Sequence, residues 1–132
     1  QVGSSGGGGH RVGQVFASAL PVAYARGTKS TDWAPFARLV LRAAYDATLA
    51  AAALAARKKS VGSNSAPTRV SVFLTCLGGG AFGNRMEWIA EAIDAALLRH
   101  AKEPLDVVLV HYGSVVKTEF KEVGRAFSVG AS

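Results

Sequence analysis

The glycine-rich segment Gly78–Asn84 has residue types and spacing that could bind an anion. Glycine lacks a Cβ, so its backbone N–H can approach a phosphate oxygen closely and its φ can be positive. A helix that starts after such a loop adds unpaired N–H groups and a partial positive charge. We therefore predict a diphosphate-binding loop that needs no lysine. The predicted ligand-binding residues are Gly78, Gly79, Gly80, Ala81, Phe82, Gly83, Asn84 and Tyr112.

These glycines also have a simpler interpretation, in which they only form a tight turn between a strand and a helix. Each glycine costs roughly 0.5–1 kcal/mol in ordered structure, so four of them favour the anion-binding interpretation. Phe82 either stacks on a ribose or base or packs the loop onto the core. Tyr112 is either a ligand contact or an ordinary residue at the end of a strand.

The other residues with reactive side chains give no catalytic or metal site. We interpret His111 as a strand-end residue, Cys76 as a small buried hydrophobe and Asp32 as a helix cap. Trp33 and Trp88 are interpreted as packing residues. The sequence thus predicts no metal and no cofactor, and it assigns no catalytic residue.

Three apolar segments and two helical patterns must position the loop. The segments Val12–Ala19, Val70–Leu77 and Leu105–Val110 are predicted strands, and the continuous hydrophobicity of the second indicates cover on both faces. A first helix is predicted to begin near Thr31 or Asp32 and to end at about Arg57. Its predicted inner face repeats at three- and four-residue steps: Phe36, Leu39, Val40, Ala43, Ala44, Ala47 and Ala51.

A second helix is predicted to follow the glycine loop. Asn84 is its predicted cap, and Glu87 completes a variant of the capping box. Its predicted inner face comprises Ile89, Ala92, Ile93, Ala96 and Leu97. The order β-α-β-α-β predicts an α/β fold, a three-layer α/β/α arrangement around a parallel sheet with right-handed crossovers. The glycine loop would lie at the carboxyl edge of that sheet, where such folds bind ligands.

Composition and charge limit the domain organisation and the partners. Residues 1–11 read as a glycine-rich linker, 12–114 as one domain and 115–132 as a C-terminal tail. The single cysteine favours an intracellular, reducing compartment. A formal charge of +6 suits an anionic partner, but no basic stripe interleaved with aromatic residues favours nucleic acid. No apolar run reaches the roughly 18–20 residues of a membrane span, so we expect no membrane association.

Three segments together carry a resemblance to a known family. Val15–Tyr24, Val72–Asn84 and Val107–Gly113, separated by two helices, resemble the C-terminal half of a macrodomain. Within that superfamily, the run Gly80-Ala81-Phe82-Gly83 is most similar to the second phosphate loop of the poly(ADP-ribose) glycohydrolase branch.

The resemblance implies an ADP-ribose ligand, with backbone amides of Gly79–Gly83 on the diphosphate and Phe82 beside the distal ribose or the base. If the protein is an enzyme, the resemblance implies an ADP-ribosyl or poly(ADP-ribose) glycohydrolase. The family's hydrolytic residues precede the matched part, so no catalytic residue carries over. The family also inserts a strand between those matching Val12–Ala19 and Val70–Leu77. We therefore expect the missing N-terminal half, or another chain, to complete the sheet.

Two other functions are compatible with the sequence. Gly78, Gly80 and Gly83 satisfy G-x-G-x-x-G, the fingerprint of a Rossmann-type NAD(P)-binding domain. That motif normally follows the first strand, and an acidic residue ends the next strand, whereas here the next strand ends in His111-Tyr112. The other alternative is an interaction module without a ligand, in which the glycines serve only the turn.

Overall fold

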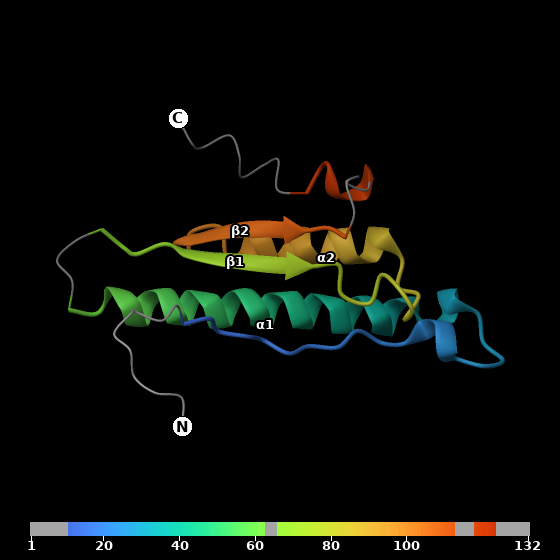
Figure 1. Ribbon diagram of the computed structural model, residues 1–132. Helices are drawn as coiled ribbons and strands as arrows, with labels where there is room; N and C mark the ends of the chain where they lie inside the picture. The colour runs from blue at the N-terminus through green and yellow to red at the C-terminus, as the bar shows by residue number, and fades with distance from the viewer. Residues whose placement is uncertain (1–10, 63–65, 113–117, 124–132) are drawn as a thin grey trace, which may run out of the picture.

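The computed structural model describes residues 11–62, 66–112 and 118–123 (Figure 1). The predicted linker except Arg11, and most of the predicted tail, lie outside these residues. The regular elements are α1 (Ala34–Ser60), β1 (Val70–Thr75), α2 (Met86–Arg99) and β2 (Leu105–Val110), with 3-10 turns at Val22–Tyr24, Ser30–Trp33 and Thr118–Phe120.

The two strands form a parallel sheet, with α2 as the crossover between them. All six residues of each strand pair in register, from Val70 opposite Leu105 to Thr75 opposite Val110. This confirms the predicted parallel β-α-β unit and the bounds of the last strand. The first of the two strands ends before Leu77, because the Leu77 amide turns inward to the Thr75 carbonyl at 2.9 Å.

The predicted strand at Val12–Ala19 is wrong, because the segment is extended but pairs with no strand. Figure 1 shows it on the far side of α1 from β1, so no sheet edge is within its reach. Only Ala19 is buried at its end, while Phe16 is 90% exposed. In the part of the chain that the structure describes, the sheet therefore has two strands.

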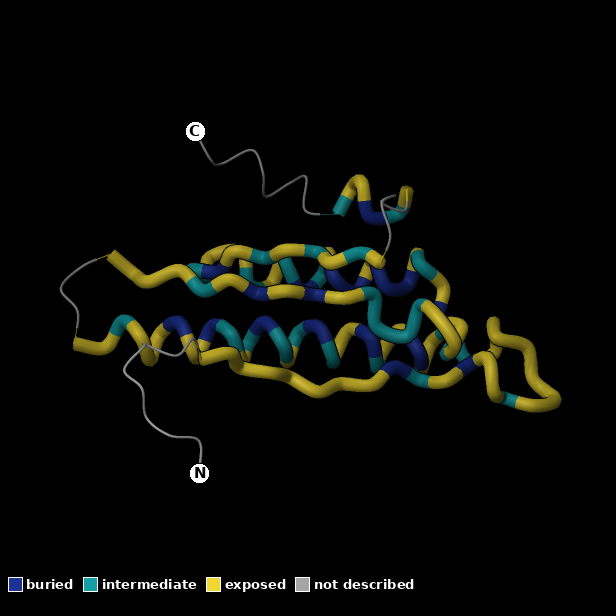
Figure 2. Tube along the Cα trace, in the orientation of Figure 1, coloured by how far each residue is buried: buried dark blue, intermediate teal, exposed yellow. Residues whose placement is uncertain are grey.

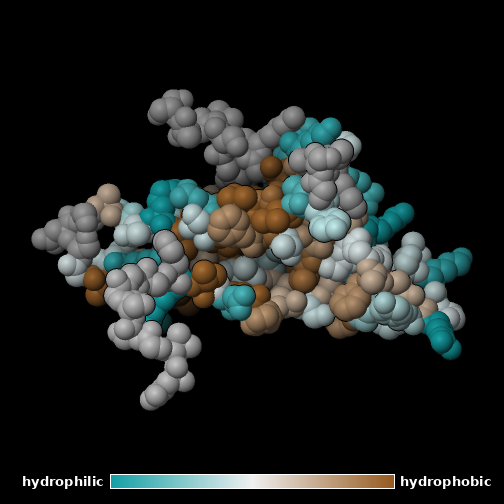
Figure 3. All heavy atoms as spheres, viewed as in Figure 1, coloured by the Kyte–Doolittle hydropathy of each residue, from teal (hydrophilic) through white to brown (hydrophobic). Residues whose placement is uncertain are grey.

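The predicted three-layer arrangement is also not formed by the described residues, because α1 and α2 share one face of the sheet. Along β1, Val72 and Leu74 are buried, whereas the alternate residues Ser71, Phe73 and Thr75 are exposed. Phe73 is 66% exposed. The result is a two-layer α/β unit with an open apolar sheet face, and Figure 3 shows hydrophobic residues gathered over the two strands.

Helix α1 forms as predicted but buries a different face. Its buried residues follow mainly four-residue steps: Ala37, Leu41, Tyr45, Leu49, Ala53 and Ala56 (Figure 2). Leu39, which was assigned to the inner face, is 62% exposed. Eleven of the 27 residues of this helix are alanines, and they occur at both buried and exposed positions. The bulky side chains of Leu41, Tyr45 and Leu49 therefore determine which face packs.

Helix α2 buries the face that its sequence predicts. Ile89, Ala92, Ile93 and Ala96 are buried, and Leu97 packs against the same core. The carboxylate of Asp46 on α1 holds the end of this helix, since its Oδ1 lies 2.9 Å from His100 Nε2 and 3.5 Å from Arg99 Nε. The two helices therefore pack as a pair against the sheet.

One segment of the described chain, Ser30–Ser60, is long and apolar enough to cross a membrane, as judged by length and composition. Six residues of its α1 portion belong to the core of the fold. A buried core helix passes the same test of length and composition. The expectation of no membrane association stays a prediction.

Candidate functional site

The glycine loop joins the carboxyl end of β1 to the start of α2. Gly78 and Gly83 have φ values of 73° and 72°, in the left-handed region that glycine adopts without strain. The loop lies at the carboxyl edge of the parallel sheet, where α/β folds bind their ligands. Its position agrees with the prediction from the sequence.

The loop uses some of its amides internally and leaves others open. Three amides of Gly78–Asn84 donate within this region: Gly79 to the Cys76 carbonyl at 3.2 Å, Gly83 to Gly80 at 3.0 Å and Asn84 to Gly78 at 3.0 Å. Within the described residues, four amides have no protein acceptor: Gly78, Gly80, Ala81 and Phe82. The three consecutive donors from Gly80 to Phe82 are the part of the loop that can bind an anion.

Three of the loop glycines have a packing reason to be glycine. A Cβ on Gly78 would collide with the Cβ of Ala19, and a Cβ on Gly79 would collide with the Met86 side chain. A Cβ on Gly83 would lie 2.8 Å from the Cβ of Ala23. These positions fit the turn interpretation as well as the anion-binding one.

Gly80 is different, because neither packing nor backbone geometry requires a glycine there. A Cβ at this exposed position would meet no atom within 4 Å, and its φ is not positive. A residue without a side chain does, however, leave the neighbouring amides fully open to a ligand. Gly80 is therefore the loop residue that the turn interpretation leaves unexplained.

Asn84 has a different role from the predicted helix cap. Helix α2 has Arg85 as its N-cap residue, with no side-chain cap hydrogen bond. Asn84 is only 3% exposed, and its Nδ2 donates to the Leu20 carbonyl at 2.8 Å and the Gly78 carbonyl at 3.3 Å. Its Oδ1 is buried without a hydrogen-bond partner in the described structure. The side chain therefore joins the loop to the N-terminal segment.

Phe82 packs the loop against the first 3-10 turn. Its ring lies edge-to-face with Tyr24, at a centroid distance of 6.3 Å, and its carbonyl accepts a hydrogen bond from the Ala23 amide at 3.0 Å. Tyr112 lies after β2 with its side chain fully exposed, and it makes no ring contact or hydrogen bond with another described residue. Phe82 therefore packs within the loop region, and the role of Tyr112 as a ligand contact stays a prediction.

Tyr45 is a supporting residue that sequence reasoning missed. Its hydroxyl donates to the Thr75 carbonyl at 2.6 Å and accepts from the Leu77 amide at 2.9 Å. Burial raises the pKa of Tyr45 to about 12, so the hydroxyl keeps its proton at neutral pH. The available signal was its place between Leu41 and Leu49 at four-residue steps. Tyr45 thus fixes the point at which β1 becomes the loop.

Charged side chains at the start of α2 have opposite signs. Arg85 is exposed next to the loop and forms no ion pair within the described residues, whereas Glu87 places a carboxylate in the first turn. The first turn has no side-chain cap, so its amides add to the local positive potential.

The described residues contain no group of three or more metal-binding side chains. The His111 ring packs edge-to-face on Phe120 at 5.3 Å, and Cys76 is half-buried at the end of β1. Asp32 does not cap α1 as predicted, because the N-cap residue of α1 is Trp33; Asp32 accepts a hydrogen bond from the Lys29 amide at 3.0 Å within the preceding 3-10 turn. Cys76 and His111 each follow the last residue pair of the sheet, Thr75 and Val110, whereas Asp32 lies in the 3-10 turn before α1.

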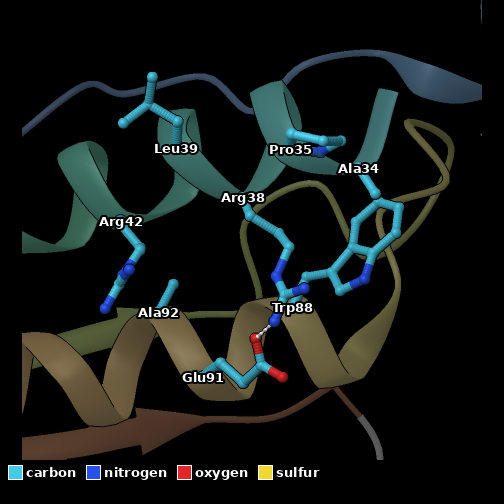
Figure 4. Close-up of a pocket in the computed structure, with 8 residues that line it drawn as sticks. All are labelled: Ala34, Pro35, Arg38, Leu39, Arg42, Trp88, Glu91 and Ala92. Atoms are coloured by element: carbon cyan, nitrogen blue, oxygen red, sulfur yellow. Dashed lines mark hydrogen bonds and ion pairs between the residues drawn. The ribbon is translucent and has the colours of Figure 1, made fainter. Parts of the chain in front are cut away.

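Two hollows lie away from the glycine loop. One is a groove of about 660 Å³ between α1 and α2 (Figure 4), and the other, of about 360 Å³, lies beside the start of β2. Neither is lined by a residue of Gly78–Asn84. The open amides of the loop are thus a surface feature, separate from these hollows.

Comparisons with known proteins found no matching family, no matching curated protein and no matching solved structure. The macrodomain resemblance therefore rests on the residues quoted for it.

Proposed function

We propose that the loop Gly78–Asn84 binds the diphosphate of a nucleotide, with ADP-ribose as the first candidate. The observation that carries the proposal is Gly80, an exposed glycine that neither packing nor φ requires, followed by two further open amides. Consecutive backbone N–H groups with no side chain in front of them form a concave donor surface for phosphate oxygens.

The contacts of a bound nucleotide follow from the loop's neighbours. The amides of Gly80, Ala81 and Phe82 donate to the diphosphate, and Arg85 contributes a nearby positive charge. Tyr24 and Phe82 offer aromatic surface to a ribose or base. Tyr45 holds the junction from which the loop extends, so the donors are positioned before the ligand arrives.

The proposal includes a polypeptide partner for the open side of the sheet. Parallel sheets are almost always covered on both faces, and exposed strand edges promote pairing with other chains. Here Phe73, Val108 and Val110 all stand on the open face. A further segment that covers this face would also extend the binding site around the loop. ADP-ribosyl hydrolysis would require catalytic groups from such a segment, and none is assigned here.

Calorimetry with Gly80→Glu tests the nucleotide proposal. The variant places a carboxylate in front of the open amides without a steric clash, so we expect ADP-ribose affinity to fall at least tenfold, about 1.4 kcal/mol. Ala55→Glu, at an exposed position of α1, is the control that changes the net charge equally. The affinity of the Ala55→Glu variant for ADP-ribose should stay within twofold of that of the unmodified chain.

The same measurement separates the alternatives. A macrodomain-like site should bind ADP-ribose more tightly than NAD or NADP, whereas a Rossmann-type site should prefer a dinucleotide. Equal weakening by both glutamate variants would show non-specific charge attraction and contradict the proposal. If none of the three nucleotides binds at millimolar concentration, the nucleotide proposal is contradicted for the chain by itself.

A further inference from the structure

The segment Val12–Ala19 is an extended chain that has no sheet to join. Within the described residues, the backbone groups of residues 12–18 form no hydrogen bond. The apolar side chains of the segment are also uncovered, since Val12 is 82% and Phe16 is 90% exposed. Water can satisfy the backbone groups, but burial of the apolar side chains would be favourable. The segment therefore has the composition and the conformation of a strand that lacks a partner.

Strand β1 has the complementary feature, an edge that no strand occupies. In a parallel pair, alternate residues of a strand direct their N–H and C=O groups toward the same neighbour. Val70 donates to the Pro104 carbonyl at 3.0 Å, on the side of β2. The N–H and C=O groups of Ser71 and Phe73 are therefore directed to the opposite edge.

The free edge of β1 is open along most of its length. Its carboxyl end is occupied, because the Thr75 carbonyl accepts hydrogen bonds from the Tyr45 hydroxyl and the Leu77 amide. No other described residue bonds to the edge groups of Ser71 or Phe73. At about 3.3 Å per residue, residues 12–18 span about 23 Å and β1 spans about 20 Å, so the segment and the edge match in length.

The segment and the edge cannot meet within one copy, because α1 lies between them (Figure 1). The segment is also held at its end, where Ala19 is buried and the Asn84 side chain bonds to the Leu20 carbonyl. A second copy has no such restriction, since it carries an identical segment and an identical edge. Two copies related by a two-fold axis can satisfy both elements at once.

We propose that the chain forms a strand-exchanged dimer, in which residues 12–18 of each copy pair with the free edge of β1 in the other. The sheet of each copy then has three strands, about the number that independent stability requires. We expect Phe16 on the open face beside Phe73, as a cross-strand aromatic pair. The alternate side chains Val15 and Ala17 then face α1, where their small size suits the space beneath a strand.

Sedimentation equilibrium of the 132-residue chain tests the proposal through single amides. Successive residues of a strand direct their N–H groups to opposite sides, so either Val15 or Phe16 donates to β1 in any register. Val15→Pro and Phe16→Pro each remove one of these donors. We expect the dimer dissociation constant to rise at least tenfold in one of the two variants. Neither N–H forms a hydrogen bond in a single copy, so both variants should fold, which circular dichroism verifies.

Matched controls keep the amides and change only the side chains. Val15→Thr and Phe16→Tyr are also good strand formers, so their dimers should have dissociation constants within threefold of that of the unmodified chain. This comparison separates backbone pairing from general loss of apolar surface.

A mixed disulfide identifies the two partners directly. In a Cys76→Ser background, Phe16→Cys and Phe73→Cys are prepared as separate chains, so a disulfide between the two positions must join two copies. Opposed side chains of neighbouring strands have Cβ atoms about 5 Å apart, close enough for a disulfide after a small shift. We expect at least ten times more mixed disulfide than from Phe16→Cys combined with Leu54→Cys, an exposed position on α1.

Three outcomes would overturn the proposal. These are a monomer at all concentrations, a dimer that neither proline variant weakens, and a mixed disulfide no more abundant than that with Leu54→Cys. A dimer that Phe73→Thr dissociates while both proline variants leave it intact would assign the association to stacked open faces. Calorimetry with ADP-ribose is independent of these measurements, so the dimer proposal and the nucleotide proposal can fail separately.

Discussion

At the residue scale, the geometry of the glycine loop depends on one buried hydroxyl. The Tyr45 side chain extends from α1 to the residues that flank Cys76. Its hydroxyl donates a hydrogen bond to the Thr75 carbonyl and accepts one from the Leu77 amide. Its removal would delete two hydrogen bonds and leave the Leu77 amide and the Thr75 carbonyl only the bond between them. Each such hydrogen bond contributes about 0.5–1.5 kcal/mol of net stability.

We predict that Tyr45→Phe lowers the free energy of unfolding by about 1–3 kcal/mol at pH 8. The pKa of Tyr45 is raised from 10.0 to about 12 in the folded chain, so the folded state keeps this proton longer than the unfolded state. The stabilisation is complete below about pH 10 and is lost as pH rises toward 12. Urea denaturation at pH 8, 10 and 11 should therefore show that the difference in free energy of unfolding between the unmodified chain and Tyr45→Phe decreases as the pH rises. A constant difference would contradict the assigned role.

The loop glycines give a second residue-scale prediction. Gly83→Ala should lower the free energy of unfolding by about 1–3 kcal/mol, because its φ is positive and its Cβ would approach Ala23. Gly80→Ala should change it by less than about 0.5 kcal/mol, since its Cβ enters open space. Urea denaturation of the two variants is the measurement. Equal losses would show that Gly80 also has a structural role.

At the element scale, the sequence was most informative where hydrophobicity and turn residues coincided. Leu105–Val110 is bounded by Pro104 and a change to His111-Tyr112, and its ends were predicted correctly. The inner face of α2 was also correct, because charged residues alternate clearly with its isoleucines. Helix α1 gave no such contrast, since its alanines occur at both buried and exposed positions. Its length could be predicted from the sequence, but its orientation could not.

The orientation of α1 gives the element-scale prediction. Ala37→Glu should lower the free energy of unfolding by at least about 3 kcal/mol, because Ala37 is fully buried in the core. Ala43→Glu should change it by less than about 0.5 kcal/mol, since Ala43 is exposed. The substitution is the same in both variants, and a glutamate in the first turn of α1 would if anything favour Ala37→Glu, so the denaturation midpoints test the burial of Ala37. If Ala43→Glu were more destabilising than Ala37→Glu, α1 would bury the face that was predicted from periodicity.

At the scale of the whole molecule, local pattern was a poor guide to strand pairing. Val12–Ala19 has the composition of a buried strand, but a strand also needs an unpaired edge beside it. The position of α1 keeps this segment away from β1 (Figure 1). The location of the glycine loop was predictable because it follows from the end of β1 alone. The roles of Tyr45 and Asn84 were not predictable, because Tyr45 bonds to Thr75, 30 residues away, and Asn84 to Leu20, 64 residues away.

The open sheet face gives the whole-molecule prediction. Sedimentation velocity of the isolated chain should show a mass above the monomer that increases with concentration, because Phe73 and its neighbours lack cover. Phe73→Thr should reduce this association, whereas Leu54→Thr, a similar change on α1, should not. A monomer that melts cooperatively would contradict the proposed partner segment.

Gly80 also makes natural variation informative. Gly78 and Gly83 should be retained in relatives that keep this turn, with or without a ligand, because both have a positive φ and a close neighbour. Residue 80 has no such structural requirement for glycine. If distant relatives keep glycine at residue 80, selection for phosphate binding is indicated. If other residues replace it freely, phosphate binding has been lost.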